Sequence, residues 1–203
     1  MAQNVSELAQ RLNRRNAKGQ KIPPLLLMTD TERLPDPSAL IPKLPAGSGI
    51  IIRHFSREEK IKLIFKVKKL CRKHKVLLLV SDDTKLALSM QCDGVHFSEL
   101  SLKKAAGIGK ALKTKPSLIY TCACHSQRFV HAAQKAKMDA ILISPVFKTN
   151  SHPNAHTKGS WGFQNLARQT HLHCFGLGGL NKKTAQQLIQ TRACGFAGIG
   201  NLL

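Results

Sequence analysis

The sequence is short of acidic residues, aromatic residues and long apolar runs, and each shortage excludes a class of protein. Eleven Asp and Glu stand against 32 Lys and Arg, which gives a formal net charge of +21. Such an excess attracts phosphates, nucleic acid and anionic membrane surfaces without choosing between them. No run of about 18 apolar residues occurs, so we predict no membrane insertion. Aromatic residues make up 5% and form no stacking array among the basic residues, so nucleic acid is not expected as a partner.

The six cysteines do not predict cross-links, because they are scattered with no spacing typical of a disulfide framework. Residues 1–21 are polar and lack the apolar segment of a signal peptide. Reduced thiols without an export signal predict a cytoplasmic protein. Cys122, Cys124 and His125 lie close enough in sequence to suggest zinc, but no second pair of ligands completes a tetrahedral set. We therefore reject zinc there.

Short apolar runs alternate with helical patterns along most of the chain. The apolar runs predict eight strands, at residues 25–30, 49–53, 76–81, 93–97, 117–122, 140–144, 173–177 and 195–199. Continuous apolar strands that alternate with helices are typical of a parallel sheet built from βα units. Eight units in 203 residues predict an α/β fold, a single-domain (β/α)8 TIM barrel. A doubly wound open sheet is the alternative, and it fits eight evenly spaced strands less well.

The two ends of the sequence depart from a regular barrel. Residues 1–21 predict an N-terminal helical and basic extension, with the helix over Val5–Asn13, and residues 22–203 contain the barrel. The sequence stops directly after the eighth strand, which predicts that the eighth outer helix is truncated or missing. We expect the N-terminal helix, or a partner subunit in a homodimer, to cover that seam.

Helical patterns separate the strands, at residues 37–44, 56–73, 83–91, 102–112, 127–136, 163–169 and 182–191. Ser56, Ser126 and Asn181 are expected to cap three of these helices, the first with Glu59 in a capping box. Lysines cluster between residues 60 and 75, and the opposite face is expected to be buried through Ile61, Ile64, Phe65 and Val67. We interpret the lysines as a solvated helix face, with a polyanion patch as the alternative.

Polar and glycine residues gather after the predicted strands, where this fold places its chemistry. A long polar loop follows the sixth strand and is interpreted as one wall of a site, with a solvated surface loop as the alternative. Leu177–Asn181 and Gly198–Asn201 follow strands seven and eight, the usual phosphate site of the fold. Glycines there allow backbone N–H groups to approach phosphate oxygens, although a tight turn explains either pair alone.

Acidic and imidazole side chains also follow or end strands. Asp82 and Asp83 end the third strand, and their carboxylates suit either Mg²⁺ or the cap of the next helix. His96 lies within the fourth strand and faces either the barrel interior or the helices. His125 ends the fifth strand, where a neutral imidazole suits acid or base chemistry near pH 7. A hydrogen-bonded loop histidine is the alternative.

Seven stretches, in order along nearly the whole sequence, carry a family resemblance: Leu27–Asp30, Val80–Asp83 with Leu86–Ala87, Cys92–His96, Cys124–Ser126, Ser144–Thr149, Gly178–Gly179 and Gly195–Gly200. The chain resembles the thiamine-phosphate synthase family, including its thiazole tautomerase branch. The resemblance implies a (β/α)8 barrel that binds a thiazole phosphate at the last two strands. For a synthase it also implies an aminopyrimidine diphosphate with Mg²⁺, from which pyrophosphate leaves as the thiazole nitrogen attacks.

Several positions depart from the synthase pattern. Of the Gln-x-Arg-x-Lys run that synthases have after the second strand, this sequence keeps only Arg53, and residues 148–152 lack the diphosphate-binding lysine. A Mg²⁺-binding Asp of the synthases is replaced by Ser101. Three further family residues, Asn, Gln and Ser, are replaced by Ser81, Glu99 and Ala123. Most lost groups belong to the diphosphate and metal half of the implied site. The thiazole-phosphate half is better kept, and His125 aligns with the catalytic histidine of the tautomerase branch.

The resemblance implies an enzyme of thiamine biosynthesis, either tautomerase-like or a divergent synthase, with His125 as the catalytic residue. Eight residues are expected to bind substrate or phosphate: Arg53, Thr149, Ser151, His152, Gly178, Gly179, Gly200 and Asn201. Asp82 is a weak metal candidate, and Mg²⁺ is a doubtful cofactor. The expected ligand is a thiazole phosphate or thiamine phosphate. The alternative is a non-enzymatic barrel that binds a phosphate, a polyanion or a partner protein.

Overall fold

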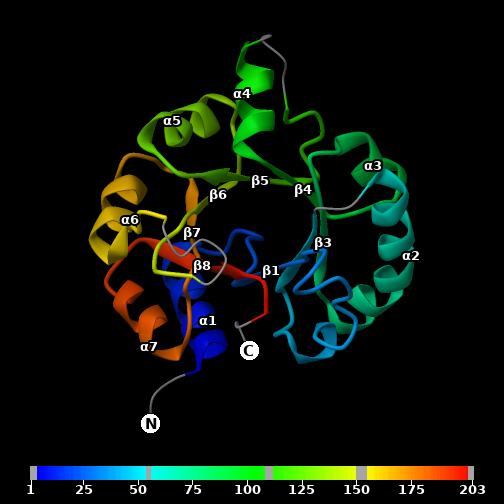
Figure 1. The fold of residues 1–203 in the computed structure, drawn as a ribbon, viewed down its shortest axis with the longest axis horizontal. Helices are drawn as coiled ribbons and strands as arrows, with labels where there is room; N and C mark the ends of the chain where they lie inside the picture. The colour runs from blue at the N-terminus through cyan, green and yellow to red at the C-terminus, as the bar shows by residue number, and fades with distance from the viewer. Residues whose placement is uncertain (1–3, 54–55, 108–111, 150–154, 201–203) are drawn as a thin grey trace.

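Eight parallel strands close into one barrel, with helices around its outside (Figure 1). The computed structural model describes residues 4–53, 56–107, 112–149 and 155–200. Each strand pairs with the next in sequence, and β8 pairs with β1 to close the ring. The strands are β1 (Leu25–Met28), β2 (Gly49–Ile52), β3 (Leu77–Ser81), β4 (Gly94–Phe97), β5 (Ile119–Cys124), β6 (Ala140–Ile143), β7 (His173–Leu177) and β8 (Ala193–Gly198). The predicted barrel is confirmed, and the open-sheet alternative is wrong.

Side chains that point alternately inward and outward along each strand form two apolar layers, one inside the barrel and one between the strands and the helices. Leu26, Met28 and Phe175 pack inside the barrel with the inward residues of other strands. Leu27 and Ile50 point outward and pack in the larger cluster that also contains helix side chains. The strands are continuous apolar runs because both of their faces are buried in this way.

The helices are α1 (Val5–Asn16), α2 (Arg57–His74), α3 (Thr84–Ser89), α4 (Glu99–Gly107), α5 (Gln127–Lys135), α6 (Gly159–Arg168) and α7 (Lys182–Ala185). Two 3₁₀ turns are η1 (Ile41–Lys43) and η2 (Gln186–Leu188), so the helices expected over 37–44 and 182–191 are shorter or divided. No helix in the described part of the chain has the length and apolar character needed to cross a bilayer.

Local capping agrees with the sequence at two of the three expected positions. The Ser56 hydroxyl accepts a hydrogen bond from the Glu59 N–H, and the Glu59 carboxylate accepts one from the Ser56 N–H, as a capping box requires. Asn181 caps α7 in the same reciprocal way with Thr184. Ser126 precedes α5, but its side chain makes no capping hydrogen bond, which corrects that expectation.

Two other helix expectations also need correction. Ile64 and Val67 are buried on α2, whereas Phe65 is 69% exposed. The buried stripe of α2 also includes Leu63 and Cys71, and Phe65 lies about 100° away from Ile64 around the helix, off that stripe. Helix α6 begins at Gly159, because the N–H of Gly159 donates to the Val146 carbonyl before the first turn. The polar loop after β6 is therefore shorter than the sequence pattern indicates.

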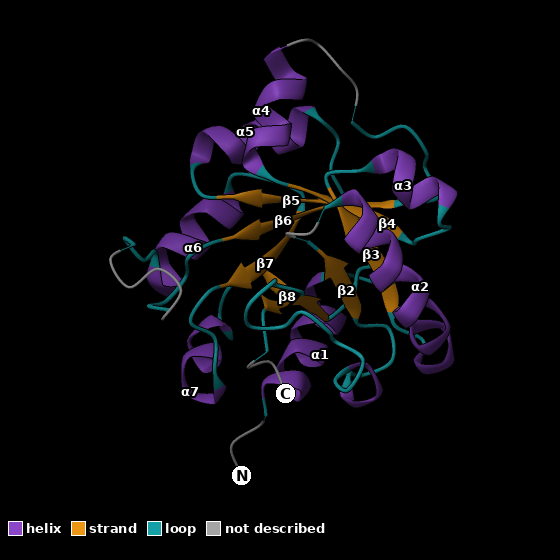
Figure 2. Cartoon of the chain, turned by 45° about the vertical axis from the view of Figure 1, so that its right-hand side comes forward, coloured by secondary structure: helices purple, strands orange, loops and turns teal. Residues whose placement is uncertain are grey.

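Helix α1 covers the outer face of β8, at the seam where β8 meets β1 (Figure 2). The Asn13 side-chain amide donates to the carbonyls of Ile22 (2.9 Å) and Cys194 (3.1 Å). Leu8 and Leu12 are buried in the same cluster as the outward side chains of the barrel. The N-terminal helix therefore packs over the seam between β8 and β1, which it or a partner subunit was expected from the sequence to cover.

Candidate functional site

The C-terminal ends of parallel strands meet at one mouth of the barrel, so residues that follow different strands converge there. The residues that follow β2, β5, β6 and β7 at this mouth include Arg53, His125, Ser144 and Gly178. The strand β5 ends at Cys124, two residues later than expected, which makes His125 the first residue beyond it.

A main-chain oxygen fixes the His125 imidazole. Its Nδ1 lies 2.9 Å from the Ser144 carbonyl oxygen and 3.1 Å from the Ser144 hydroxyl. A carbonyl oxygen can only accept, so this contact favours the tautomer with the proton on Nδ1. The neutral ring then presents an unprotonated Nε2. His125 is exposed at the mouth, so Nε2 is accessible to a ligand.

Glu99 contacts His125, and Lys158 lies within electrostatic reach of Glu99. The Glu99 carboxylate accepts a hydrogen bond from the His125 backbone N–H. Burial lowers the pKa of Lys158, and the nearby Glu99 carboxylate opposes that change. Sequence reasoning treated Lys158 as a residue of a polar loop and missed it as a site residue. The signal in the sequence is weak, since a lysine before a helix is common.

The glycine pair after β7 is pressed against the chain that follows β6. A Cβ built on Gly179, which has φ +65°, would overlap the Lys148 carbonyl oxygen and the Phe147 carbonyl (2.7 Å). A Cβ on Gly178, at φ +96°, would lie 3.2 Å from Pro145 and 3.4 Å from the Thr149 methyl. The chain segment after β6 therefore approaches these two glycines closely, and the contact at Gly179 alone is enough to require glycine there. The same approach brings Thr149 beside Gly178, two of the expected binding residues.

The same turn leaves backbone donors available. Within the described part of the chain, the N–H groups of Gly178, Gly179 and Leu180 donate to no backbone or side-chain acceptor. Successive backbone N–H groups without an internal acceptor are the donors that anion-binding turns use. Gly200 has φ +133° with open space where a Cβ would stand. Ser151, His152 and Asn201 lie outside the described residues.

Arg53 follows β2 on another side of the mouth and is partly buried. Its backbone N–H donates to the Thr29 hydroxyl at 2.9 Å. Burial lowers the pKa of the guanidinium, and the Asp30 carboxylate opposes that change. Asp30 itself is paired with Arg33 at 2.7 Å. The Arg53 side chain donates no hydrogen bond to any residue that the structure describes, so it can receive an anionic group.

His96 faces the barrel interior, which settles the choice left open by the sequence. Its Nδ1 lies 2.9 Å from the Thr121 hydroxyl of β5, and burial lowers its pKa to about 4. The imidazole is therefore neutral near pH 7. It forms part of the floor beneath the mouth.

The two aspartates after β3 are mostly engaged by the protein. Asp83 caps α3 through Oδ1, which accepts from the Leu86 N–H, and its Oδ2 pairs with Arg57. Asp82 Oδ1 accepts from the backbone N–H of Ser98 at 2.8 Å. Among the described residues, no three His, Cys, Asp or Glu side chains are grouped as metal ligands. Asp82 Oδ2 is the one oxygen of the two carboxylates that accepts no hydrogen bond from a described residue.

Comparisons with known proteins point to one family. The family model described as "Thiamine monophosphate synthase" matches residues 44–202. A protein of Aquifex aeolicus (strain VF5) named "Putative thiamine-phosphate synthase 2" is 31% identical over 145 residues, which are 71% of this chain and 76% of that protein. A thiamine-phosphate synthase of Prochlorococcus marinus subsp. pastoris is 28% identical over 155 residues, which are 73% of this chain and 43% of that protein.

A solved structure has the same barrel. The "Thiamine phosphate pyrophosphorylase from Pyrococcus furiosus" superposes with a TM-score of 0.71 at 23% identity, and the match covers 92% of this chain and 88% of that one. At that identity the likeness shows the fold alone.

Proposed function

Because the chain belongs to the thiamine monophosphate synthase family, we propose that it acts in thiamine biosynthesis on a thiazole phosphate held at the C-terminal mouth of the barrel. The proposed reaction is the transfer of a proton between two positions of a thiazole carboxylate phosphate, as in the tautomerase branch. The observation that carries the proposal is the His125 imidazole, which is fixed through Nδ1 and accessible at Nε2.

The phosphate is proposed to bind at the β7 turn. Unpaired N–H groups from Gly178 to Leu180 would donate to its oxygens, with Thr149 at the same turn. Ser151, His152, Gly200 and Asn201 remain proposed ligands from the adjoining loops. Arg53 is proposed to pair with the carboxylate of the substrate, because its guanidinium is partly buried and donates no hydrogen bond to a described residue.

The proton transfer requires one base and no external reactant. His125 Nε2 would remove the proton from one ring position, and the imidazolium would return it to the other. Glu99 would hold the His125 backbone, and Lys158 would stabilise negative charge on the deprotonated ring. General acid–base groups of this kind typically contribute about a hundred- to ten-thousand-fold in rate.

A divergent synthase is the second candidate, and the names of the relatives favour it. The synthase reaction would need a bound diphosphate with Mg²⁺, and the donor set around Asp82 and Asp83 is mostly engaged. We therefore derive no step through a metal. Pyrophosphate release with both substrates distinguishes the candidates: we expect little or none, whereas robust Mg²⁺-dependent release that is lost in Asp82→Ala would establish the synthase.

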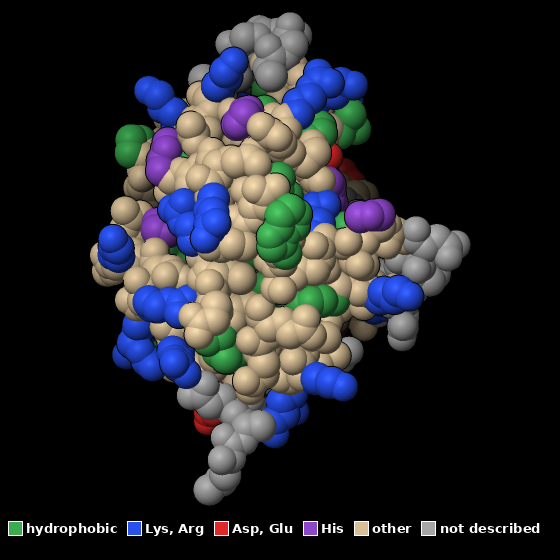
Figure 3. Space-filling model, turned by 90° about the vertical axis from the view of Figure 1, so that its left-hand side faces the viewer, with side chains coloured by type: hydrophobic (Ala, Val, Ile, Leu, Met, Phe, Trp, Pro, Cys, Tyr) green, Lys and Arg blue, Asp and Glu red, His purple; other side chains and the backbone are tan. Residues whose placement is uncertain are grey.

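A non-enzymatic, polyanion-binding barrel is the third candidate. Figure 3 shows Lys and Arg side chains in several separate groups, most of them toward the edges of the visible face. Several lysines of α2 also have local partners: Lys60 donates to the Ser81 carbonyl and Lys66 pairs with Asp36. This arrangement supports solvated surface charge more than a polyanion track.

The central test joins binding and chemistry. Calorimetric titration with a thiazole phosphate and with thiamine phosphate measures binding, and single-turnover NMR follows proton transfer on the thiazole carboxylate phosphate. We expect binding and isomerisation by the wild-type protein. Binding without isomerisation would make the protein a phosphate-binding relative without this chemistry, and no binding would overturn the proposed site.

A further inference from the structure

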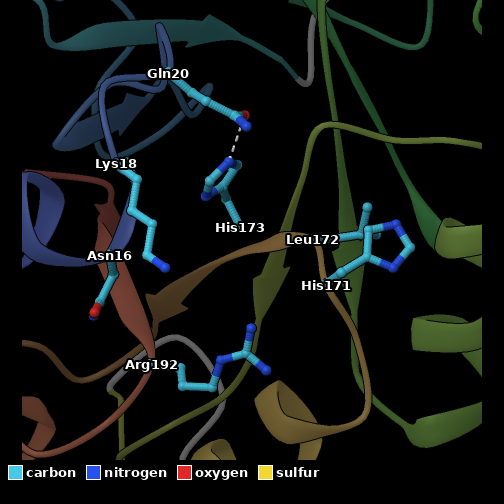
Figure 4. Close-up of a pocket in the computed structure, with 8 residues that line it drawn as sticks. Asn16, Lys18, Gln20, His171, Leu172, His173 and Arg192 are labelled. Carbon is cyan, nitrogen blue, oxygen red and sulfur yellow. Dashed lines mark hydrogen bonds between the residues drawn. The ribbon is translucent and has the colours of Figure 1, made fainter.

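A cavity lies at the opposite end of the barrel from the candidate active site. It has a volume of about 320 Å³ and is lined by the end of α1 and the following loop, by the start of β7, and by Arg192. His173 is the first residue of β7 and Arg192 directly precedes β8, whereas the candidate active site follows the last residues of the strands. The cavity is therefore formed at the N-terminal ends of the strands (Figure 4).

The lining of this cavity is cationic. Lys18, Arg192, His171 and His173 all line it, and the described lining contains no carboxylate. Arg192 is held in place because its Nη1 donates to the carbonyls of Ala167 and Thr170, both at 3.0 Å. Figure 4 shows Lys18 and Gln20, from the loop after α1, and Arg192, which precedes β8, around the start of β7 at His173. Lys18 donates no hydrogen bond to any residue in the described part of the chain.

His173 lies in the same cavity as Lys18 and Arg192 and is joined to the loop after α1. Its Nε2 lies 2.7 Å from the Gln20 Oε1, which ties the start of β7 to the loop after α1. Burial lowers its pKa, Arg192 lowers it further, and Asp139 opposes them. Asp139 cannot act as the counter-ion of the cavity, because its carboxylate accepts from the Lys113 ammonium and from the Tyr120 N–H.

We propose that this cavity binds a small oxyanion of the phosphate class, at a site separate from the candidate active site. Lys18 and Arg192 supply the charge, and the guanidinium retains donors beyond the Nη1 that it uses for the two carbonyls. The cavity volume is about ten times that of one water molecule in the liquid, so an organic portion can accompany the anion. Binding would bridge the end of α1 to β7 and β8.

The experiment titrates the protein with inorganic phosphate while NMR follows the backbone amides, with ionic strength kept constant by chloride. Amides of residues 16–20, 171–173 and 192 report on the cavity, and those of Gly178–Leu180 report on the active site. Lys18→Gln removes one cation of the cavity. Lys21→Gln is the matched control, because Lys21 is an exposed lysine of the same loop that does not line the cavity.

We expect saturable shifts of the cavity amides. Their dissociation constant should rise by on the order of tenfold in Lys18→Gln, the usual effect of losing a hydrogen bond to a charged group, and should stay unchanged in Lys21→Gln. Both substituted side chains are exposed, and well-dispersed spectra would show that both variants are folded.

Three results would overturn the site. These are shifts that never saturate, equal weakening in the two variants, and shifts confined to Gly178–Leu180. A parallel titration with glycerol phosphate distinguishes the source of the anion. Tighter binding of the ester than of inorganic phosphate supports a phosphorylated metabolite, and equal binding supports the free ion.

Discussion

The orientation of His125 depends on a main-chain oxygen rather than on another ionisable side chain. The Ser144 carbonyl at 2.9 Å holds the proton on Nδ1, and no substitution of the Ser144 side chain removes that oxygen. The hydroxyl at 3.1 Å is a secondary contact. The proposed base is therefore positioned by the end of β6, which also begins the polar loop of the mouth.

At this position, His125→Asn should lower the rate of thiazole isomerisation by about a hundred- to ten-thousand-fold. Asparagine keeps a hydrogen-bonding group beside Ser144 but cannot take up a proton near pH 7. Affinity for the phosphate ligand should stay nearly unchanged, because other residues are proposed to bind it. Single-turnover NMR measures the rate and calorimetry the affinity. His131→Asn, an exposed histidine of α5, is the control. Equal rates in the wild type and in His125→Asn would make His125 structural.

Gly179 offers a second residue-scale prediction, about stability. Gly179→Ala should destabilise the protein by more than the roughly 1–2 kcal/mol that a left-handed backbone costs a non-glycine residue. The excess arises because the new Cβ would overlap the Lys148 carbonyl oxygen and the Phe147 carbonyl (2.7 Å). Gly159→Ala is the matched control, since Gly159 has φ +62° and no atom within 4 Å of the Cβ position. Urea unfolding measures both variants, and equal losses would contradict the close approach.

At the scale of elements, most of the barrel could be predicted because its strands are apolar on both faces and its helices carry local start signals. Ser56 and Glu59, which are three positions apart in the sequence, form a capping box that marks the start of α2 through local contacts alone. Phe65 was wrongly predicted to be buried, because the sequence pattern does not distinguish a hydrophobic residue next to the buried face of α2 from one on that face. The start of α6 was missed because it depends on the Val146 carbonyl, which only the folded loop brings to Gly159.

The candidate site was less predictable than the barrel. The family resemblance indicates His125 and the glycine pair, but sequence alone does not show that Gly179 meets the Phe147 carbonyl or that Glu99 meets the His125 N–H. The cavity near Lys18 was missed altogether. Its residues come from three segments, and nothing in a one-dimensional pattern places residues 18, 173 and 192 together.

The docking of α1 on β8 gives the element-scale prediction. Asn13→Ala should destabilise the protein by about 1–3 kcal/mol, because the Ile22 and Cys194 carbonyls lose their shared side-chain donor in a partly buried place. Arg14→Ala, an exposed neighbour on the same helix, should have little effect. Chemical denaturation of the two variants provides the comparison. A stability of Asn13→Ala equal to that of the wild type would show that the apolar contacts of Leu8 and Leu12 suffice.

For the whole molecule, the charge of +21 makes repulsion within the compact state a general feature, and protonation of buried groups adds to it in a defined pH range. His96 is neutral inside the barrel because burial lowers its pKa to about 4. Asp82 opposes this lowering and Arg53 reinforces it. Burial also lowers the pKa of His173. The Asp30 carboxylate behaves in the opposite sense, since its hydrogen bonds with Arg33 lower its pKa and favour the charged form.

These directions predict how stability depends on pH. Between pH 6.5 and about 4 the unfolded chain takes up a proton at residue 96 and the folded protein does not, so the free energy of unfolding should fall as the pH falls. The full effect of His96 corresponds to about 3 kcal/mol, for a pKa that falls from 6.5 to about 4. The contribution of Asp30 is lost only at lower pH, below its ordinary pKa of 3.8.

Urea unfolding at steps of half a pH unit measures how steeply the free energy of unfolding depends on pH. His96→Gln, which keeps a hydrogen-bonding group for Thr121, should flatten this dependence between pH 6.5 and 4, whereas Asp30→Asn should leave that interval unchanged. An unaltered slope in His96→Gln would place the acid sensitivity in other groups, with His173→Gln as the next variant to measure.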